Sequence, residues 1–228
     1  MNRLRALGRA LVVAGLLLAA QNLLAADQDA VLTAWFAAQT NVQSWSADFV
    51  QTRTLKTLTQ PLTARGHVDF VAPDKFHWAL GEPARTIALR SGDEMFVIYP
   101  LLKRAERYPL GENTPKQLRD MMSLLQAGFP RSRAEFEAQF QVRSLTETNG
   151  DWCFALQPKS KFAAQLMPEL QISVATNDFS LARTELIFVD DSRMRSDFTH
   201  AVVNPPLDGK LFEWTPPADF KVTNPLAP

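Results

Sequence analysis

The chain has 228 residues, of which 46% are hydrophobic and 21% charged, and this composition predicts a globular protein with one hydrophobic core. Its 24 basic and 24 acidic residues give a net charge of zero, and loss of the first 26 residues, which include Arg3, Arg5 and Arg9 but no acid, leaves 21 basic against 24 acidic residues. Lys and Arg are not clustered as phosphate binding requires, so a nucleic-acid partner is disfavoured.

The N-terminus has the three parts of a secretory signal peptide. The segment MNRLRALGR is basic, ALVVAGLLLAA is apolar, and NLLAA offers small residues for cleavage. We therefore predict that residues 1–26 are a signal peptide and that residues 27–228 form a single exported domain. An uncleaved membrane anchor is the alternative, but the apolar run is shorter than the ~20 residues that span a bilayer.

Cysteine usage limits how the exported domain is held together. Cys153 is the only cysteine in the sequence. A single cysteine excludes an intramolecular disulfide and disfavours a structural zinc cluster. No cysteine lies near the predicted cleavage site, which argues against a lipid-anchored lipoprotein. The stability of the domain must therefore come from its core.

Two segments have the period of amphipathic helices. In residues 27–43 the apolar stripe consists of Val31, Leu32, Trp35 and Phe36. Residues 114–129 begin with a capping box, with Thr114 as N-cap, Pro115 at the first helical position and Gln117 three residues after the cap. The apolar stripe of this second helix consists of Leu118, Met121, Met122, Leu125 and Phe129.

Most of the remaining chain alternates between apolar and polar residues, which predicts strands with one buried face. The alternation is clearest in residues 45–49, 64–70, 76–80, 87–90, 152–157, 169–174 and 193–198. Turn signals such as VAPD, LGEP, SGDE, TETNGD and VDDS separate the strands. We predict a mainly β (α+β) fold in which about nine to eleven strands form a curled antiparallel sheet, an incomplete β-barrel.

The apolar face of such a sheet must be covered, and the two amphipathic helices are available to cover it. A tight cover gives an ordinary core, whereas a loose and movable cover leaves a lipid-sized cavity. Met121 and Met122 favour the second interpretation slightly, because thioether side chains adapt to variable cargo. Gly66, inside a predicted strand, is consistent with a bend or a close backbone approach. Pattern alone leaves both interpretations open.

A search for catalytic and metal-binding patterns returns little. The three histidines, His67, His77 and His200, show no metal-ligand spacing and are predicted to be solvated. No nucleophile elbow, phosphate-binding glycine loop or Cys/His pair is present. Asp190 and Asp191 are typical of a hairpin turn. We therefore predict no catalytic residue, no metal and no cofactor, and the protein is expected not to be an enzyme.

Several short motifs follow one another in a recognisable order. The run SADFVQTRTLKTLTQPLTARGHVDFVAPDKFHWALGEP is followed by SGDEMFVIYP and later by FVDDSRMRSDFTHAVVNPPLDGKLFEWTPPADFKV. The first run resembles the N-terminal half, and the last run the closing pattern, of the LolA family of periplasmic outer-membrane lipoprotein carriers. The resemblance extends over nearly all of the chain after the signal peptide.

The resemblance implies a half-barrel closed by a helical lid, with the acyl chains of cargo held between sheet and lid. It implies that the lid includes Leu118, Met121, Met122, Leu125 and Phe129. It also implies a monomer in the periplasm of a Gram-negative bacterium, which accepts lipoprotein from an inner-membrane exporter and delivers it to an outer-membrane acceptor. The concave-face residues expected to line the lipid cavity are Phe49, Val68, Phe70, Phe76, Trp78, Leu80, Ile87, Leu89, Phe154, Ile172 and Phe198.

One position departs from the family pattern. LolA-like carriers place an arginine immediately before the proline of the PDKF turn, where it helps to hold the lid shut, whereas this chain has Ala72. Lid closure must then rest on other contacts. The cargo is expected to be a lipoprotein or another amphiphile, such as a glycolipid, a polyene lipid or an isoprenoid lipid. A periplasmic lipid sensor and an exported hydrolase are the other functional alternatives.

Overall fold

The computed structural model describes residues 28–111, 114–116, 118–120, 122 and 127–225. The predicted signal peptide, residues 1–26, lies outside the described residues, and so do Met121 and Leu125 of the predicted lid. None of the helices within the described ranges is long and apolar enough to cross a membrane.

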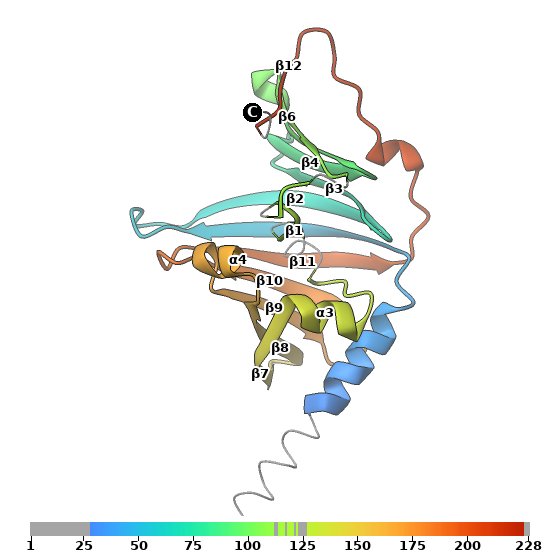
Figure 1. Ribbon diagram of the computed structural model, residues 1–228, viewed down its shortest axis with the longest axis vertical. Helices are drawn as coiled ribbons and strands as arrows, with labels where there is room; N and C mark the ends of the chain where they lie inside the picture. The colour runs from blue at the N-terminus through green and yellow to red at the C-terminus, as the bar shows by residue number, and fades with distance from the viewer. Residues whose placement is uncertain (1–27, 112–113, 117, 121, 123–126, 226–228) are drawn as a thin grey trace, which may run out of the picture.

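A single twelve-stranded sheet forms the body of the molecule (Figure 1). Its strand order is β12-β6-β5-β4-β3-β2-β1-β11-β10-β9-β8-β7, and all neighbouring pairs are antiparallel except β12 and β6, which are parallel. The bounds are β1 (Ser44–Thr54), β2 (Leu62–Val71), β3 (Lys75–Leu80), β4 (Thr86–Ser91), β5 (Glu94–Tyr99), β6 (Arg104–Pro109), β7 (Phe140–Thr148), β8 (Asp151–Pro158), β9 (Glu169–Ala175), β10 (Leu181–Ile187), β11 (Arg193–Val203) and β12 (Lys221–Thr223).

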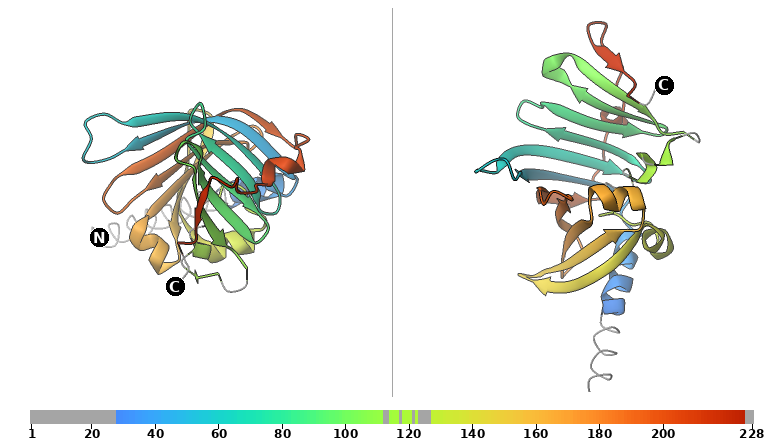
Figure 2. Two further views of the ribbon diagram at one scale, coloured as in Figure 1. Left: turned by 90° about the horizontal axis from the view of Figure 1, so that it is seen from above. Right: turned by 60° about the vertical axis from the view of Figure 1, so that its left-hand side comes forward.

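The sheet curls without closing, and its inner face wraps around helical segments (Figure 2). Antiparallel pairing aligns side chains across strands, because residues directly opposite one another point to the same face. Trp45, Phe49 and Gln51 of β1 define the inner face, and Asp48 and Val50 define the outer face. The prediction of a mainly β fold with a curled, open antiparallel sheet is confirmed.

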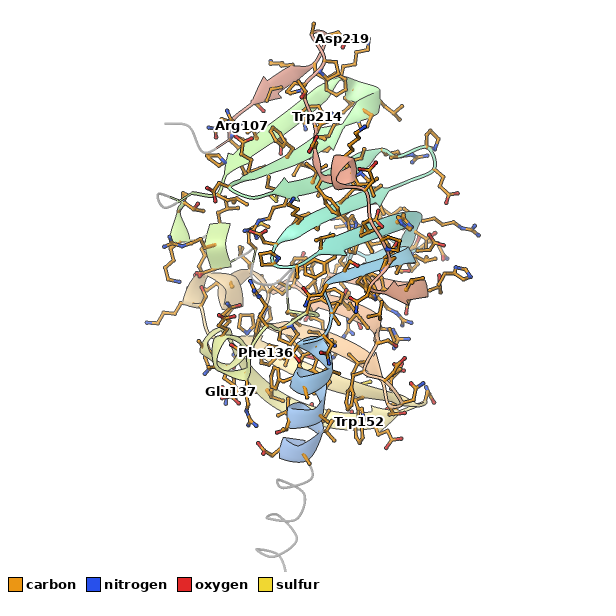
Figure 3. All side chains as sticks on the ribbon, turned by 90° about the vertical axis from the view of Figure 1, so that its right-hand side faces the viewer. Arg107, Phe136, Glu137, Trp152, Trp214 and Asp219 are labelled. Atoms are coloured by element: carbon orange, nitrogen blue, oxygen red, sulfur yellow. The ribbon has the colours of Figure 1, made fainter. Side chains whose placement is uncertain are left out.

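The predicted N-terminal helix is present over residues 28–39, and it packs on the β7–β9 end of the inner face. Trp35 is completely buried and stacks on Phe154, with ring centroids 4.6 Å apart. Helix α3 (Arg133–Gln139) adds Phe136, which meets Trp35 edge-on at 5.3 Å (Figure 3). This end of the sheet is therefore a filled aromatic core.

Short helical segments connect other parts of the sheet. Residues 116, 118–120 and 122 are helical, as expected from the helix predicted over residues 114–129, but residues 127–129 form a turn and a bend, so the prediction is too long at its C-terminal end. Helix α4 (Lys161–Leu166) was not predicted, and it begins at Ser160, whose hydroxyl accepts a hydrogen bond from the backbone N–H of Ala163. Short 3-10 helices are present at η1 (Pro100–Leu102) and η2 (Gly209–Phe212).

A second apolar cluster lies on the outer face of β4–β6. It contains Leu89, Phe96 and Ile98, and the C-terminal segment covers it with Trp214 and Phe220. The Trp214 ring lies 5.2 Å from Phe96 and 5.7 Å from Phe220 (Figure 3). The sheet is consequently apolar on its inner face at one end and on its outer face at the other.

Gly66 occupies a point where the backbone of β3 and the ring of Phe49 leave no room for a side chain. A Cβ atom at this position would lie 2.3 Å from Phe49 Cζ and 2.4 Å from the carbonyl oxygen of Ala79. The ring has some freedom to move, but the carbonyl belongs to the ladder between β2 and β3. The close approach expected at this glycine is therefore present.

We predict that Gly66→Ala lowers the free energy of unfolding by about 2 to 3 kcal/mol, because the added methyl group displaces strand backbone. Urea denaturation followed by circular dichroism measures the change. Gly209→Ala is the matched control, since open space surrounds its Cβ position, and it is expected to change stability by less than about 0.5 kcal/mol. Equal stability of the two variants would contradict the prediction.

Candidate functional site

An apolar cavity of about 270 Å³ lies on the inner face of the sheet, beneath the segment that contains Gly128 and Phe129. Its wall is mainly aromatic and aliphatic, with a few polar side chains, as in sites that hold apolar ligands. The lining residues are Trp45, Gln51, Val68, Phe70, Phe76, Trp78, Ala88, Gly128, Phe129, Leu170, Leu181, Thr184, Leu186, Met194, Ser196 and Phe198.

Strand register brings the aromatic side chains of the cavity together. Trp45 of β1 lies opposite Phe70 of β2, and Phe70 lies opposite Phe76 of β3. One step along the strands, Val68 lies opposite Trp78. Because each pair shares a face, three neighbouring strands present a continuous apolar surface.

Phe129 covers the cavity from the helical side. Its ring stacks on Phe70 at 4.8 Å with an interplanar angle of 10°, and it lies 5.0 Å from the ring of Trp45. Met122 is buried and Leu118 is half-buried. Phe129, one of the residues predicted for the lid, is therefore in direct contact with the cavity wall.

The structure distributes the predicted cavity residues among four places, three of them on the inner face. Val68, Phe70, Phe76, Trp78 and Phe198 line the cavity. Phe49, Phe154 and Ile172 face the same way but are buried in the core cluster. Leu80 lines a neighbouring pocket instead.

Ile87 and Leu89 lie on the opposite face of the sheet from the cavity, which corrects their expected placement. Trp78 lies opposite Ala88, so Ala88 faces inward and its neighbours in β4 face outward. Alternation identifies which residues share a face, but not which face of the sheet they occupy. The apolar character of Ile87 and Leu89 is explained by their burial beneath the C-terminal segment.

Several lining residues were not singled out by the sequence. Leu181 and Leu186 belong to β10, where an irregularity between Leu181 and Arg183 breaks the alternation. Trp45 and Leu170 do alternate in phase with predicted cavity residues. The sequence could not identify these two as lining residues, because it does not show which part of the inner face is filled by packing and which part is left as a cavity.

A polar strip crosses the floor of the cavity. Gln51 of β1 lies opposite Ser196 of β11, which lies opposite Thr184 of β10. Gln51 is 7% exposed and Ser196 4% exposed. Within the described ranges, no hydrogen bond reaches the side chain of Gln51 or Ser196. Buried polar groups are normally hydrogen-bonded, so this strip is suited to meet polar atoms of a ligand.

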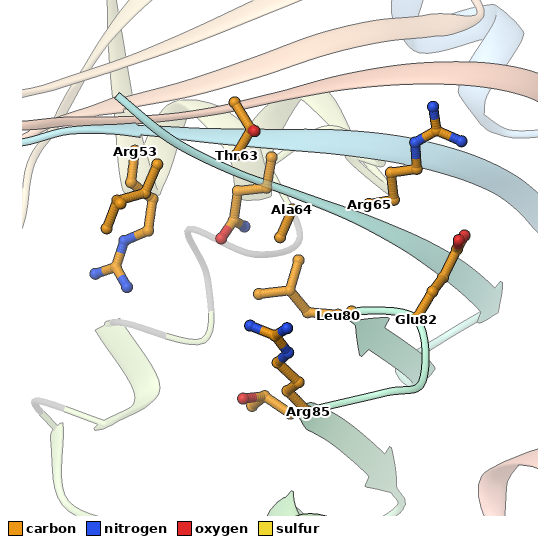
Figure 4. Close-up of a pocket in the computed structure, with 11 residues that line it drawn as sticks. Arg53, Thr63, Ala64, Arg65, Leu80, Glu82 and Arg85 are labelled. Carbon is orange, nitrogen blue, oxygen red and sulfur yellow. The ribbon is translucent and has the colours of Figure 1, made fainter. Parts of the chain in front are cut away.

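A second pocket, of about 500 Å³, adjoins the cavity (Figure 4). It lies at the ends of the strands, where the first residues of β2 extend past the last residue of β3. Gln51 lines both spaces. The second pocket is more polar, and its charged lining residues are Arg53, Arg65, Glu82 and Arg85. The two spaces together place an apolar region beside a predominantly cationic one.

The three histidines lie on the outer face, and two of them, His67 and His200, contact Asp48. His67 Nδ1 lies 2.7 Å from Asp48 Oδ1, and His200 Nδ1 lies 3.2 Å from Asp48 Oδ2. His77 lies across from Asp69 in the ladder between β2 and β3. Nowhere in the part of the chain that the structure describes do three or more His, Cys, Asp or Glu side chains form a group able to hold a metal ion.

The surroundings of His67 and His77 shift the pKa values of the two side chains in opposite directions. Burial lowers the pKa of His67, but hydrogen bonds and charges from Asp48 and Asp69 outweigh it, so the pKa is raised overall. Burial lowers the pKa of His77, whose Nδ1 has no hydrogen-bond partner among the described residues. Folding therefore makes His67 easier to protonate and His77 harder to protonate than a free imidazole.

We predict that His67→Gln destabilises the protein at pH 5 more than at pH 9. A folded-state pKa above the unfolded value of about 6.5 contributes stability below that pH, and the contribution is lost as the pH rises through the folded-state pKa. The loss at pH 5 is expected to be less than about 1 kcal/mol, because the ion pairs are half exposed. Urea denaturation at both pH values measures it, with His200→Gln as the control for an exposed member of the same cluster. A loss independent of pH would contradict the prediction.

The sequence is similar to a known protein family and to several of its members. The family model described as "Outer membrane lipoprotein carrier protein LolA" matches residues 40–215. The outer-membrane lipoprotein carrier protein of Pseudoalteromonas translucida is 27% identical over 187 residues, covering 80% of this chain and 81% of that protein. The carrier of the same name from Bordetella avium is 25% identical over 182 residues, covering 79% and 81%.

Among solved structures, an uncharacterized conserved protein from Thermus thermophilus shares the fold. The TM-score is 0.50 at 9% sequence identity, over 87% of this chain and 99% of that one. The family model spans well over half of the sequence, from the end of the N-terminal helix to the C-terminal segment over the outer face. The chain therefore belongs to the LolA family of outer membrane lipoprotein carrier proteins.

Proposed function

We propose that this protein is a periplasmic carrier that holds the acyl chains of lipoproteins or related lipids in its inner-face cavity and passes them from the inner to the outer membrane. Membership of the LolA family supports this function. The observation that carries it is the aromatic cavity closed by Phe129. The expected partners are an inner-membrane exporter and an outer-membrane acceptor, and the carrier itself is expected to be a monomer.

The size of the cavity indicates how cargo enters. A space of about 270 Å³ is small for the several acyl chains of a lipoprotein, because pockets for drug-sized ligands already measure about 300–1,000 Å³. Loading therefore requires the segment around Phe129 to move away from Phe70 and Trp45. Each buried methylene group contributes about 0.8 kcal/mol, so loaded cargo leaves slowly unless a partner assists release.

The contacts of Phe129 also account for the departure at Ala72. Ala72 has no polar side-chain atom, and its backbone N–H donates to the carbonyl oxygen of Gln43 at 2.8 Å. In this chain, aromatic stacking of Phe129 on the sheet takes the place of an arginine clamp. Leu118 and Met122, in the helical segment before Phe129, are proposed to belong to the same movable cover.

A hydrolase is the less favoured function. Ser46 Oγ lies 3.2 Å from His67 Nε2, and His67 Nδ1 lies 2.7 Å from Asp48. This chain of contacts resembles the Ser-His-Asp triad of hydrolases. However, Ser46 donates its hydroxyl proton to Asp69 at 2.7 Å, so the hydroxyl is not directed to the base. The group also lies on the outer face, on the other side of the sheet from the cavity.

We predict that Phe76→Glu reduces the affinity for a fluorescent fatty acid at least tenfold, because a carboxylate in the cavity is desolvated and repels the acid. Phe76 is half-buried and belongs to no aromatic pair within the described ranges, so the variant is expected to stay folded. Val50→Glu, on the outer face, is the control and keeps normal affinity. Equal binding by the folded Phe76→Glu variant would exclude the cavity as the lipid site.

We also predict that Phe129→Ala accelerates uptake of the same fatty acid several-fold, since it removes the ring that covers the cavity. Stability is expected to fall by about 1 to 3 kcal/mol through loss of the contacts with Phe70 and Trp45. Stopped-flow fluorescence measures the uptake rate. Phe162→Ala, at an exposed position in α4, is the control and leaves the rate unchanged. An unchanged rate for Phe129→Ala would show that this ring does not limit entry.

A further inference from the structure

We propose that the pocket beside the cavity binds the anionic headgroup of an amphiphile through Arg53 and Arg85, so that this carrier selects lipids with a phosphate or carboxylate group. The inference rests on the proposed function, because it requires acyl chains in the neighbouring cavity. It goes beyond that function by naming the chemistry of the cargo at its polar end.

The first step of the argument is the position of the pocket. Strand β2 begins at Leu62, but its pairing with β3 starts only at Gly66, where Leu80 lies opposite. The chain then turns away from β2 through residues 81–85, and the pocket lies between that turn and the first residues of β2. It therefore opens at the end of the sheet, next to the end of the cavity.

The second step is the charge of the pocket. In Figure 4 the side chains of Arg53 and Arg85 extend into the pocket, whereas Arg65 and Glu82 point away from it. Register agrees for Arg65, which lies opposite Val50 and so belongs to the outer face. Two guanidinium groups thus face the pocket from different parts of the chain.

The third step is that neither guanidinium group, that of Arg53 or that of Arg85, has an ion-pair or hydrogen-bond partner among the described residues. Several other arginines of the sheet are paired with carboxylates, as Arg90 is with Asp74 at 3.0 Å and Arg183 is with Asp197 at 2.7 Å. Guanidinium groups bind phosphate and carboxylate oxygens through directed hydrogen bonds, which suits an anionic ligand group.

The fourth step is the junction between the two spaces. Gln51 is more than nine-tenths buried, lines both the cavity and the pocket, and has no hydrogen-bond partner for its side chain among the described residues. Ser196, directly opposite, is equally without a side-chain partner there. An amide and a hydroxyl at this point can bond to the ester oxygens of a lipid.

Together, the cavity and the pocket form a site whose polarity increases from the aromatic side chains to the two arginines. Aromatic side chains such as Phe76 and Trp78 receive acyl chains, Gln51 meets the ester region, and the two arginines meet a negative charge. An uncharged diacylglyceryl group would fill the first two regions and leave the arginines unused. The matching ligand is therefore an acylated molecule with an anionic group next to its ester linkages.

The test compares two lipids with the same chains. The purified protein is titrated with dioctanoyl phosphatidic acid and with dioctanoylglycerol, and binding is followed by the fluorescence of the cavity tryptophans. We expect about tenfold tighter binding of the phosphatidic acid, a preference that declines as salt is raised. The double variant Arg53→Gln/Arg85→Gln loses the preference but keeps the affinity for dioctanoylglycerol, and the control Arg65→Gln keeps both.

Other outcomes separate this inference from the proposed function. Equal affinity of the wild-type protein for the two lipids, or a preference that survives in the double variant, would overturn the headgroup site while leaving the carrier function intact. Inorganic phosphate that binds as tightly as the phosphatidic acid would identify a site for the free ion and overturn the inference. Failure of both lipids to bind would refute the proposed function, and the inference with it.

Discussion

An open, curled sheet with one aromatic face must be covered, and the rest of this structure depends on how that requirement is met. At the β7–β9 end, the helix over residues 28–39 and α3 pack on the face, and Trp35 stacks on Phe154 in a filled core. In the middle, the cover narrows to the segment around Phe129 and leaves a cavity beneath it. Tight and loose packing, the two alternatives open from sequence, therefore occur side by side on the same face.

The sequence predicted the strands well wherever one face is apolar and the other is polar. It was less informative for β6, whose sequence RAERYP does not alternate, and for β10, where an irregular register interrupts the pattern. It also placed Ile87 and Leu89 in the cavity, because periodicity does not show which face of a sheet a distant segment covers. Only the position of Trp214 and Phe220 reveals that the outer face of β4 is buried.

The polar features of the site were still harder to derive from sequence. Gln51 alternates in phase with Phe49, but its burial and its place between two pockets follow from pairing with β2 and β11. Arg53 and Arg85 are separated by 32 positions, and they line the same pocket because β2 extends past the end of β3. The histidine cluster likewise joins His67 and His200 through their common neighbour Asp48, which is a product of strand order and not of spacing.

The two ends of the chain fasten different halves of the sheet. The N-terminal helix packs on β7–β9, whereas the C-terminal segment crosses the outer face of β4–β6 and ends in β12, which pairs with β6. The cavity lies across the middle of the sheet, and most of its lining residues belong to β1, β2, β3, β10 and β11. The two terminal segments therefore hold the sheet on either side of the cavity, one against the inner face and the other against the outer face.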